Sequence, residues 1–140
     1  MTGYLDASAL VKRYVDEEGS EHVAGWLDRP SATSRWTQVE ILSAVARRWR
    51  EGFLTDEDRD GIAGALADDL TGLYVVEVTA DVIAIARRLL ARHALRAGDA
   101  VQLASAQLIW QRTGDPVRFC SFDVRLNAAA AAEGLTVATS

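Results

Sequence analysis

The sequence has few cysteines, no long apolar run and no repeats, and each of these absences limits the classes of protein to which the chain can belong. Its one cysteine, Cys120, cannot form an internal disulfide, which fits a reducing cytoplasm. No apolar run approaches the roughly 20 residues that span a bilayer, so no membrane association is expected. The first residues hold an acid, Asp6, and no basic stretch, so no secretory signal is expected. There is no linker, low-complexity tract or internal repeat, and 140 residues suggest one domain.

Lysine is also scarce, because Lys12 is the only one and the other basic side chains are arginines. The net charge of −5 excludes a generic binder of polyanions. A nucleic-acid substrate would need a local basic patch or bound cations to offset the repulsion. Arginine suits bidentate contacts with phosphate, but an Ala- and Arg-rich overall composition explains its abundance more simply.

Short β-like runs alternate with longer helical ones, which predicts an α/β domain with a parallel sheet of four to five strands flanked by helices. The expected strands cover residues 3–5, 31–34, 74–78, 117–120 and 135–137, with the last at an edge. The expected helices cover residues 8–15, 21–27, 37–50, 55–70, 80–93, 98–112 and 123–134. Ser20 and Thr79 are the expected N-caps of the second and fifth helices.

Four acidic residues stand where strands end or helices begin. Asp6 follows the first strand, and Asp123 follows the fourth strand and opens a helix. Glu40 and Asp99 fall in the first turns of two other predicted helices. In a doubly wound sheet, the carboxyl ends of the strands and the starts of the next helices share one edge, where ligand sites form. Four acids far apart in the sequence could therefore meet in one pocket.

Each acid alone has a simpler explanation, because acidic residues favour helix N-termini. The spacing of Thr37 and Glu40 also fits a capping box, in which Glu40 would be purely structural. The flanking sequence favours a shared role, since Asp6 follows an apolar strand and Asp99 opens a helix rich in small residues. Carboxylates buried together need a neutralising cation, and Mg²⁺ or Mn²⁺ prefers such hard oxygen ligands.

Four segments together resemble the PIN-domain family, and within it the VapC-type toxins of bacterial toxin–antitoxin pairs. The segments are YLDASALVK (4–12), TQVEI (37–41), LRAGDAVQLA (95–104) and SFDVRL (121–126). The resemblance covers essentially the whole chain. It implies a Mg²⁺- or Mn²⁺-dependent endoribonuclease whose catalytic and metal-binding residues are Asp6, Glu40, Asp99 and Asp123. Family members often have a larger apolar residue where Gly98 stands and a histidine where Gln102 stands.

The resemblance also implies partners, namely an RNA substrate and a cognate VapB-type antitoxin. We expect an antitoxin segment to lie in the groove by the acidic site and to offer a basic side chain to the carboxylates. A homodimer that buries exposed apolar helix faces is expected as well. Asp6 and Asp99 are expected to be the primary metal ligands, because a central strand and a closely packed helix hold them rigidly. Glu40 and Asp123 are expected to act through bound water.

Two serines lie close to the acids in the sequence. Ser8 follows Asp6 by two residues, and Ser121 precedes Asp123 by two. Both match hydroxyl positions near the family's site, so they could orient the Asp6 and Asp123 carboxylates. Helix capping is an equally good explanation for each of them.

Three further residues are candidates for substrate contact. Trp36 could stack on a base, although core packing or a dimer contact explains it as well. Arg47 lies seven residues after Glu40 on about the same helix face, and Arg96 precedes the Asp99 carboxylate by three residues. Each arginine could meet phosphate or simply be a solvated surface residue. His22 and His93 have no metal-ligand spacing with other histidines or cysteines, so they are assigned no chemistry.

Other functions fit the same pattern less well. A haloacid-dehalogenase-type phosphatase would need a second aspartate at position 8, where the chain has Ser8. A receiver domain would need an acidic pair after the first strand and a lysine after a late strand, but the only lysine is Lys12. A non-enzymatic alternative is a PIN-like binding module that keeps the fold and has lost catalysis. The presence of all four acids argues against this alternative.

Overall fold

A five-stranded parallel sheet forms the centre of the molecule. The structure, a computed structural model, describes residues 1–138. The strands are β1 (Thr2–Leu5), β2 (Ser31–Ser34), β3 (Tyr74–Val76), β4 (Val117–Cys120) and β5 (Thr136–Ala138), in the spatial order β3-β2-β1-β4-β5. Every pair of neighbouring strands is parallel. The predicted α/β fold with a parallel sheet is therefore confirmed, and the carboxyl ends of all five strands lie along one edge.

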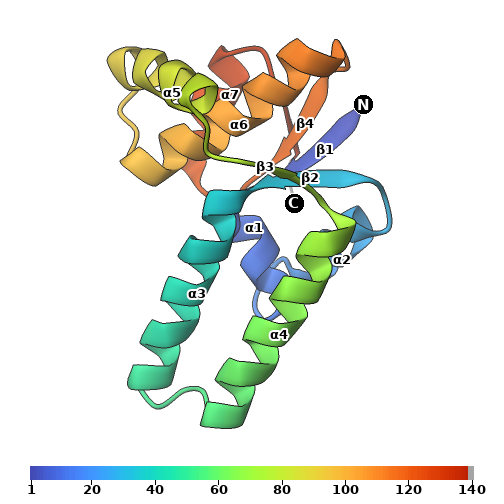
Figure 1. Cartoon of the computed structure of the whole chain (residues 1–140), viewed down its shortest axis with the longest axis vertical. Helices are drawn as coiled ribbons and strands as arrows, with labels where there is room; N and C mark the ends of the chain where they lie inside the picture. Colours follow the sequence, from blue (N-terminus) through green and yellow to red (C-terminus); the bar gives the residue numbers. More distant parts are fainter. Residues whose placement is uncertain (139–140) are drawn as a thin grey trace.

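Helices cover both faces of this sheet (Figure 1). The helices are α1 (Ala7–Leu10), α2 (Ser20–Leu27), α3 (Arg35–Arg50), α4 (Asp56–Gly72), α5 (Ala80–Arg92), α6 (Ala97–Thr113) and α7 (Val124–Ala132), and a 3-10 helix, η1 (Val11–Arg13), continues α1. Side chains of α1 to α4 share one core with Leu5 and Cys120, and side chains of α5 to α7 share another with Tyr4 and Phe119. The alternation along each strand thus fills two cores. No helix within residues 1–138 combines the length and apolar character needed to cross a membrane.

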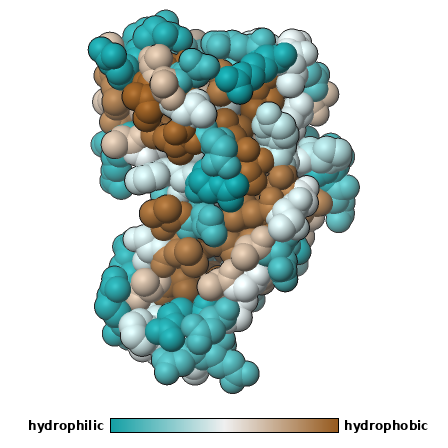
Figure 2. Space-filling view, viewed as in Figure 1, coloured by the Kyte–Doolittle hydropathy of each residue, from teal (hydrophilic) through white to brown (hydrophobic). Residues whose placement is uncertain are grey.

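Helices α3 and α4 leave the sheet side by side as a hairpin, called the arm below (Figure 1). At its tip the Trp49 indole donates to Asp56 Oδ1 at 2.7 Å, and Thr55 and Asp58 form a capping box that starts α4. Figure 2 shows apolar residues gathered at the base of the arm and hydrophilic residues at its tip. The arm is thus held at both ends and carries an apolar surface where it meets the body.

Two local predictions about helix starts were wrong. Ser20 is the first residue of α2 and not its N-cap, which is Gly19 with a left-handed φ of 92°. Helix α3 starts at Arg35, two residues before the predicted start, because the Ser34 hydroxyl at the end of β2 accepts from the Trp36 amide at 3.0 Å. The second correction places Glu40 beyond the first turn of α3, so it takes no part in a capping box.

Candidate active site

The four predicted acids all lie at the carboxyl edge of the sheet, each on a different element. Asp6 follows β1 and caps α1, and Asp123 follows β4 and caps α7. Glu40 lies in the second turn of α3, and Asp99 lies in the first turn of α6. Burial is the largest cause of the raised pKa of Asp6, Glu40 and Asp99, and in each case the next acid in this series adds to it. Along the edge, Asp6 is thus affected by the charge of Glu40, Glu40 by that of Asp99, and Asp99 by that of Asp123.

Asp6 is the most buried of the four, with 3 % of its surface exposed. Its Oδ1 accepts from the Ser8 hydroxyl at 2.7 Å and from the Ala9 amide at 2.9 Å, and its Oδ2 accepts from the Ser121 hydroxyl at 2.7 Å. Burial raises the pKa of Asp6 to about 6 even though these hydrogen bonds oppose the rise. The carboxylate is therefore held in one orientation. Its ionised form is destabilised by burial, and a nearby cation would relieve this destabilisation.

The two serines join β1 to the loop that follows β4. Besides binding Asp6, Ser8 Oγ accepts from the Phe122 amide at 2.9 Å, and Ser121 Oγ accepts from the Asp123 amide at 3.0 Å. Neither hydroxyl is bonded to the Asp123 carboxylate, whose Oδ1 accepts from two amides at the start of α7. The serines thus orient Asp6 and fix the backbone that carries Asp123.

The Lys12 side chain also contacts this loop, through Phe122. Its ammonium lies 4.4 Å from the centre of the Phe122 ring and 3.0 Å from Glu17 Oε1. The Lys12 side chain is only 11 % exposed. The single lysine of the chain therefore packs beside the site as part of its scaffold, a position that its sequence spacing did not indicate.

Glu40 is held by a residue that sequence reasoning did not single out as part of the site. The Gln102 amide, on α6, donates to Glu40 Oε1 at 2.9 Å. Burial raises the pKa of Glu40, the charge of Asp99 adds to the rise, and the hydrogen bond from Gln102 opposes it. The only sequence signal for Gln102 was its departure from the histidine that is frequent in the family.

Trp36 closes over the start of α6 beside Glu40. A Cβ added to Gly98 would stand 3.1 Å from the Trp36 Nε1 and 3.4 Å from Glu40 Oε2. The missing side chain at Gly98 therefore lets α3 approach α6 closely enough to bring Glu40 beside Asp99. The Trp36 side chain remains 39 % exposed, so part of its ring is available at the site.

The two candidate arginines differ in their relation to the acids. Arg96 is the exposed N-cap residue of α6, and its charge opposes the rise in the pKa of Asp99. Arg47 is exposed on α3, two turns beyond Glu40. Arg96 is thus next to the acidic edge, whereas Arg47 lies farther along the arm.

The donor chemistry of the site fits a divalent cation, although no ligand cage is preformed. No three histidine, cysteine or acidic side chains of residues 1–138 converge closely enough to enclose an ion as they stand. Mg²⁺ commonly takes one or two carboxylates and keeps several of its waters. Four carboxylates at one edge, three of them with pKa values raised in part by a neighbouring acid, suit such a hydrated ion.

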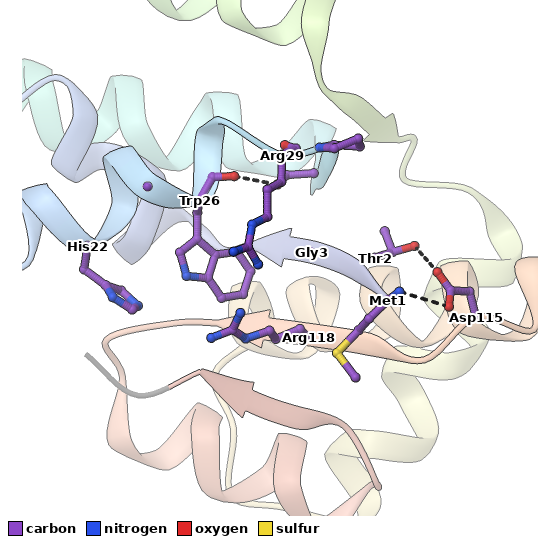
Figure 3. Close-up of a pocket in the computed structure, with 11 residues that line it drawn as sticks. Met1, Thr2, Gly3, His22, Trp26, Arg29, Asp115 and Arg118 are labelled. Atoms are coloured by element: carbon purple, nitrogen blue, oxygen red, sulfur yellow. Dashed lines mark hydrogen bonds and ion pairs between the residues drawn. The ribbon is translucent and has the colours of Figure 1, made fainter.

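A hollow of about 660 Å³ lies at the opposite, amino end of β1 (Figure 3). Its lining includes His22, Arg29 and Arg118, and the Arg118 guanidinium lies 4.8 Å from the centre of the Trp26 ring. Among residues 1–138, Asp115 is the one acid that lines the hollow, and it forms an ion pair with the Met1 amine at 3.3 Å. This hollow holds no carboxylate cluster, so the acidic edge is the candidate active site.

Comparisons with known proteins agree with this site and fold. Residues 3–139 match the PIN domain family model. The ribonucleases VapC45 and VapC49 of Mycobacterium tuberculosis are each 36 % identical to the chain over 138 residues, which cover 96 % of this chain and 93 % of theirs. The chain therefore belongs to the PIN-domain family.

Solved structures with the same fold have less similar sequences. The crystal structure of Mycobacterium tuberculosis VapC20, described as a sarcin-ricin loop cleaving toxin, has a TM-score of 0.68 at 20 % identity, covering 95 % of each chain. A toxin–antitoxin complex from Klebsiella pneumoniae also has a TM-score of 0.68, at 15 % identity, covering 98 % of this chain and 96 % of that one. These likenesses support the fold across nearly the whole chain.

Proposed function

We propose that the chain is the ribonuclease toxin of a VapBC-type pair and hydrolyses RNA phosphodiester bonds with Mg²⁺ or Mn²⁺. The observation that carries this proposal is the placement of Asp6, Glu40, Asp99 and Asp123 along one edge of the sheet, on four separate elements. The relatives at 36 % identity, which are named as ribonucleases, support the same reaction. Helix capping explains Asp6 and Asp123, but it does not explain Glu40 or Asp99, and the pKa values of Asp6, Glu40 and Asp99 are each raised in part by another of the four acids.

The chain's own residues have distinct parts in this reaction. Asp6 and Asp99 would contact the cation directly, and Glu40 and Asp123 would act through its bound waters. When bound, the cation supplies a more acidic water and stabilises charge on the phosphate. Trp36 offers an exposed ring for a base beside Glu40, and Arg96 offers a positive charge to the RNA backbone.

Cleavage of RNA by the purified chain tests this function. We expect cleavage with Mg²⁺ or Mn²⁺, loss of cleavage in excess EDTA, and products with 5′-phosphate and 3′-hydroxyl ends. Asp6→Asn and Asp99→Asn should abolish cleavage in single-turnover assays, while Glu40→Gln and Asp123→Asn reduce it strongly. Cleavage that persists in EDTA, or ends with 2′,3′-cyclic phosphate, would contradict the metal mechanism. A folded wild-type chain without nuclease activity on any RNA would favour the catalytically inactive binding module instead.

We also propose that the chain pairs with a small VapB-type antitoxin and forms a homodimer. Several similar structures are of toxin–antitoxin assemblies, including VapBC2 of Rickettsia felis bound to a promoter DNA fragment. Apolar side chains stand exposed near the site, since Val39 is 54 % and Val124 is 83 % exposed. An antitoxin segment beside the acids would bring a basic side chain to them. A chain that is monomeric by light scattering, and harmless when expressed alone, would contradict both parts.

A further inference from the structure

Gln102 is an amide buried directly behind the acidic edge. It lies on α6, one turn after Asp99, and only 1 % of its surface is exposed. Its Oε1 accepts from the Tyr4 hydroxyl at 2.6 Å, and its Nε2 donates to Thr37 Oγ1 and to Glu40 Oε1, both at 2.9 Å. Because its oxygen and both of its N–H groups form hydrogen bonds, the buried amide is held in a single position.

A series of buried hydroxyl groups links Gln102 to the backbone of β1. The Thr33 hydroxyl lies 2.7 Å from the Leu5 carbonyl, which can only accept, so Thr33 donates its one proton there. Thr33 Oγ1 also lies 2.8 Å from Thr37 Oγ1. The Thr37 hydroxyl accepts from Gln102 Nε2 at 2.9 Å and donates to Gln102 Oε1 at 3.3 Å. Both polar atoms of the Gln102 amide are thus joined to the polar groups of β1 and β2.

The Glu40 carboxylate, which can only accept when ionised, fixes which end of the amide faces it. If the amide were turned over, Gln102 Oε1 would face the carboxylate and two acceptors would meet without a proton between them. In the orientation observed, Nε2 has two protons and gives one to Thr37 and one to Glu40. The Tyr4 hydroxyl completes the set by donating to Oε1. Gln102 thus presents a neutral donor of fixed direction to one carboxylate oxygen.

The other oxygen of Glu40 is left for the site. Glu40 Oε2 lies on the side of Gly98 and Trp36, because a Cβ added to Gly98 would stand 3.4 Å from it. A glutamate side chain has three rotatable bonds, and a free one would occupy many rotamers. Holding Oε1 removes most of this freedom and directs Oε2 toward the first turn of α6, which carries Asp99.

We propose that Gln102 is a positioning residue that acts through Glu40, holding one of its oxygens so that the other is oriented for a hydrated divalent cation. This inference rests on the proposed metal-dependent function. The competing explanation is that these hydrogen bonds only satisfy polar groups that are buried between α3 and α6. The two explanations differ in one respect, because a purely structural amide would change folding stability without any specific effect on cation binding through Glu40.

Mn²⁺ binding to the purified chain without RNA, followed by electron paramagnetic resonance of free Mn²⁺, separates the explanations. Gln102→Met keeps the length of the side chain and removes both donors. We expect it to weaken Mn²⁺ binding about tenfold, the lower end of the effect of losing a group that orients a ligand. Gln102→His, which keeps a donor, should bind Mn²⁺ nearly as the wild type does. Ser31→Ala removes a buried hydroxyl at the far end of β2 and serves as the control, with unchanged binding.

The decisive measurement is a double-mutant cycle with Glu40→Gln. If Gln102 acts through Glu40, Gln102→Met should add almost nothing to the loss of Mn²⁺ binding already caused by Glu40→Gln. Additive losses would overturn the inference, and so would wild-type Mn²⁺ binding by Gln102→Met. If Gln102→Met does not fold, Gln102→Asn keeps the amide but withdraws it by one methylene, and the same cycle applies. Failure of the wild type itself to bind Mn²⁺ would overturn the metal-dependent function, and the inference with it.

Discussion

Among single residues, the buried Asp6 carboxylate has the clearest effect on stability. Its pKa is about 6 in the folded chain and 3.8 without the fold, so it binds its proton more tightly when folded. Below pH 3.8 both states are protonated and the charge costs nothing. Above pH 6 both states are ionised and the folded state is destabilised by about 3 kcal/mol, at 1.36 kcal/mol per pKa unit. Stability without metal should therefore fall as the pH rises from about 4 to about 6.

Asp6→Asn should abolish cleavage and yet stabilise the metal-free chain at pH 7.5. The asparagine oxygen can accept from Ser8 and the Ala9 amide, and its amide can donate to Ser121, so the helix cap is kept. Urea unfolding at pH 4 and pH 7.5 measures the effect, and the advantage of the variant should appear only at the higher pH. Added Mn²⁺ should stabilise the wild type and reduce the gap. A variant less stable than the wild type at pH 7.5 would show that the ionised Asp6 does not destabilise the fold.

The role of Asp123 in capping α7 can be separated from its proposed role in cleavage. Its Oδ1 caps α7 by accepting from the Arg125 and Leu126 amides. Asp123→Asn keeps an oxygen for this cap and should melt near the wild-type temperature while cleaving RNA much more slowly. Asp123→Ala should lose the same activity and also about 1 kcal/mol of stability. Equal stability of the two variants would mean that the cap contributes little.

The placement of the four acids at one edge of the sheet was predictable from the sequence, whereas the hydrogen bonds around Gln102 were not. Parallel strands bring residues such as Asp6 and Asp123 to one edge whatever the details of packing. The contact between Gln102 and Glu40 joins residues 62 positions apart on two helices. It depends on the exact approach of α3 to α6, which depends in turn on the missing side chain of Gly98. No periodicity in the sequence contains that information.

At the scale of secondary structure elements, the packing of α2 on β1 depends on a missing side chain. The Trp26 ring lies against Gly3 in the hollow of Figure 3, and a Cβ on Gly3 would stand 3.0 Å from the ring and 3.1 Å from Ser31 Oγ. Gly3→Ala should therefore destabilise the chain by about 1–3 kcal/mol. The activity of the folded fraction should be unchanged, because Asp6 lies at the other end of the strand.

Gly25→Ala on the exposed side of the same helix is the matched control. Nothing lies within 4 Å of a Cβ at this position, and alanine is the better helix former. It should raise the free energy of unfolding by about 0.5–1 kcal/mol. Denaturant titrations of both variants test the pair, and a neutral Gly3→Ala would mean that Trp26 can shift without loss.

Element types were easier to predict than element starts. β2 was placed correctly at 31–34, although its four residues are all buried and carry no alternation. The starts of α2 and α3 were wrong because several residues nearby could cap, and the choice depends on backbone conformation. Gly19 takes a left-handed φ, and Ser34 ends its strand with an extended backbone that aims its hydroxyl at α3. The local sequence allows either of two neighbouring residues to be the N-cap, and the tertiary structure determines which of them is used.

Across the whole molecule, the net charge of −5 means that any binding of RNA would depend on local positive charge. Arg96→Ala should weaken the binding of single-stranded RNA. The slope of the logarithm of the binding constant against the logarithm of the salt concentration should become less negative by about 0.7, the value for one lost phosphate contact. Arg47→Ala should have a smaller effect, because it lies farther from the acids. Binding is best measured with the Asp6→Asn background between 50 and 200 mM salt.

Arg112 provides the control for these arginines. It lies in the last turn of α6, at the end away from Asp99, and pairs with Asp81 at 3.2 Å. Arg112→Ala should leave the affinity for RNA and its salt slope unchanged. Equal losses from Arg96→Ala and Arg112→Ala would mean that RNA binding follows total charge and not a contact near the acidic edge.

The hydrogen bond between Asp6 and Ser121 also has a consequence for timing during synthesis. The two residues are 115 positions apart, so Asp6 leaves the ribosome long before its partner does. At about 5–20 residues per second, the interval is about 6–23 s. Through that time β1 lacks β4, and the Asp6 carboxylate lacks the hydroxyl that orients it. A translating ribosome is therefore not exposed to a finished active site on its own nascent chain until synthesis is almost complete.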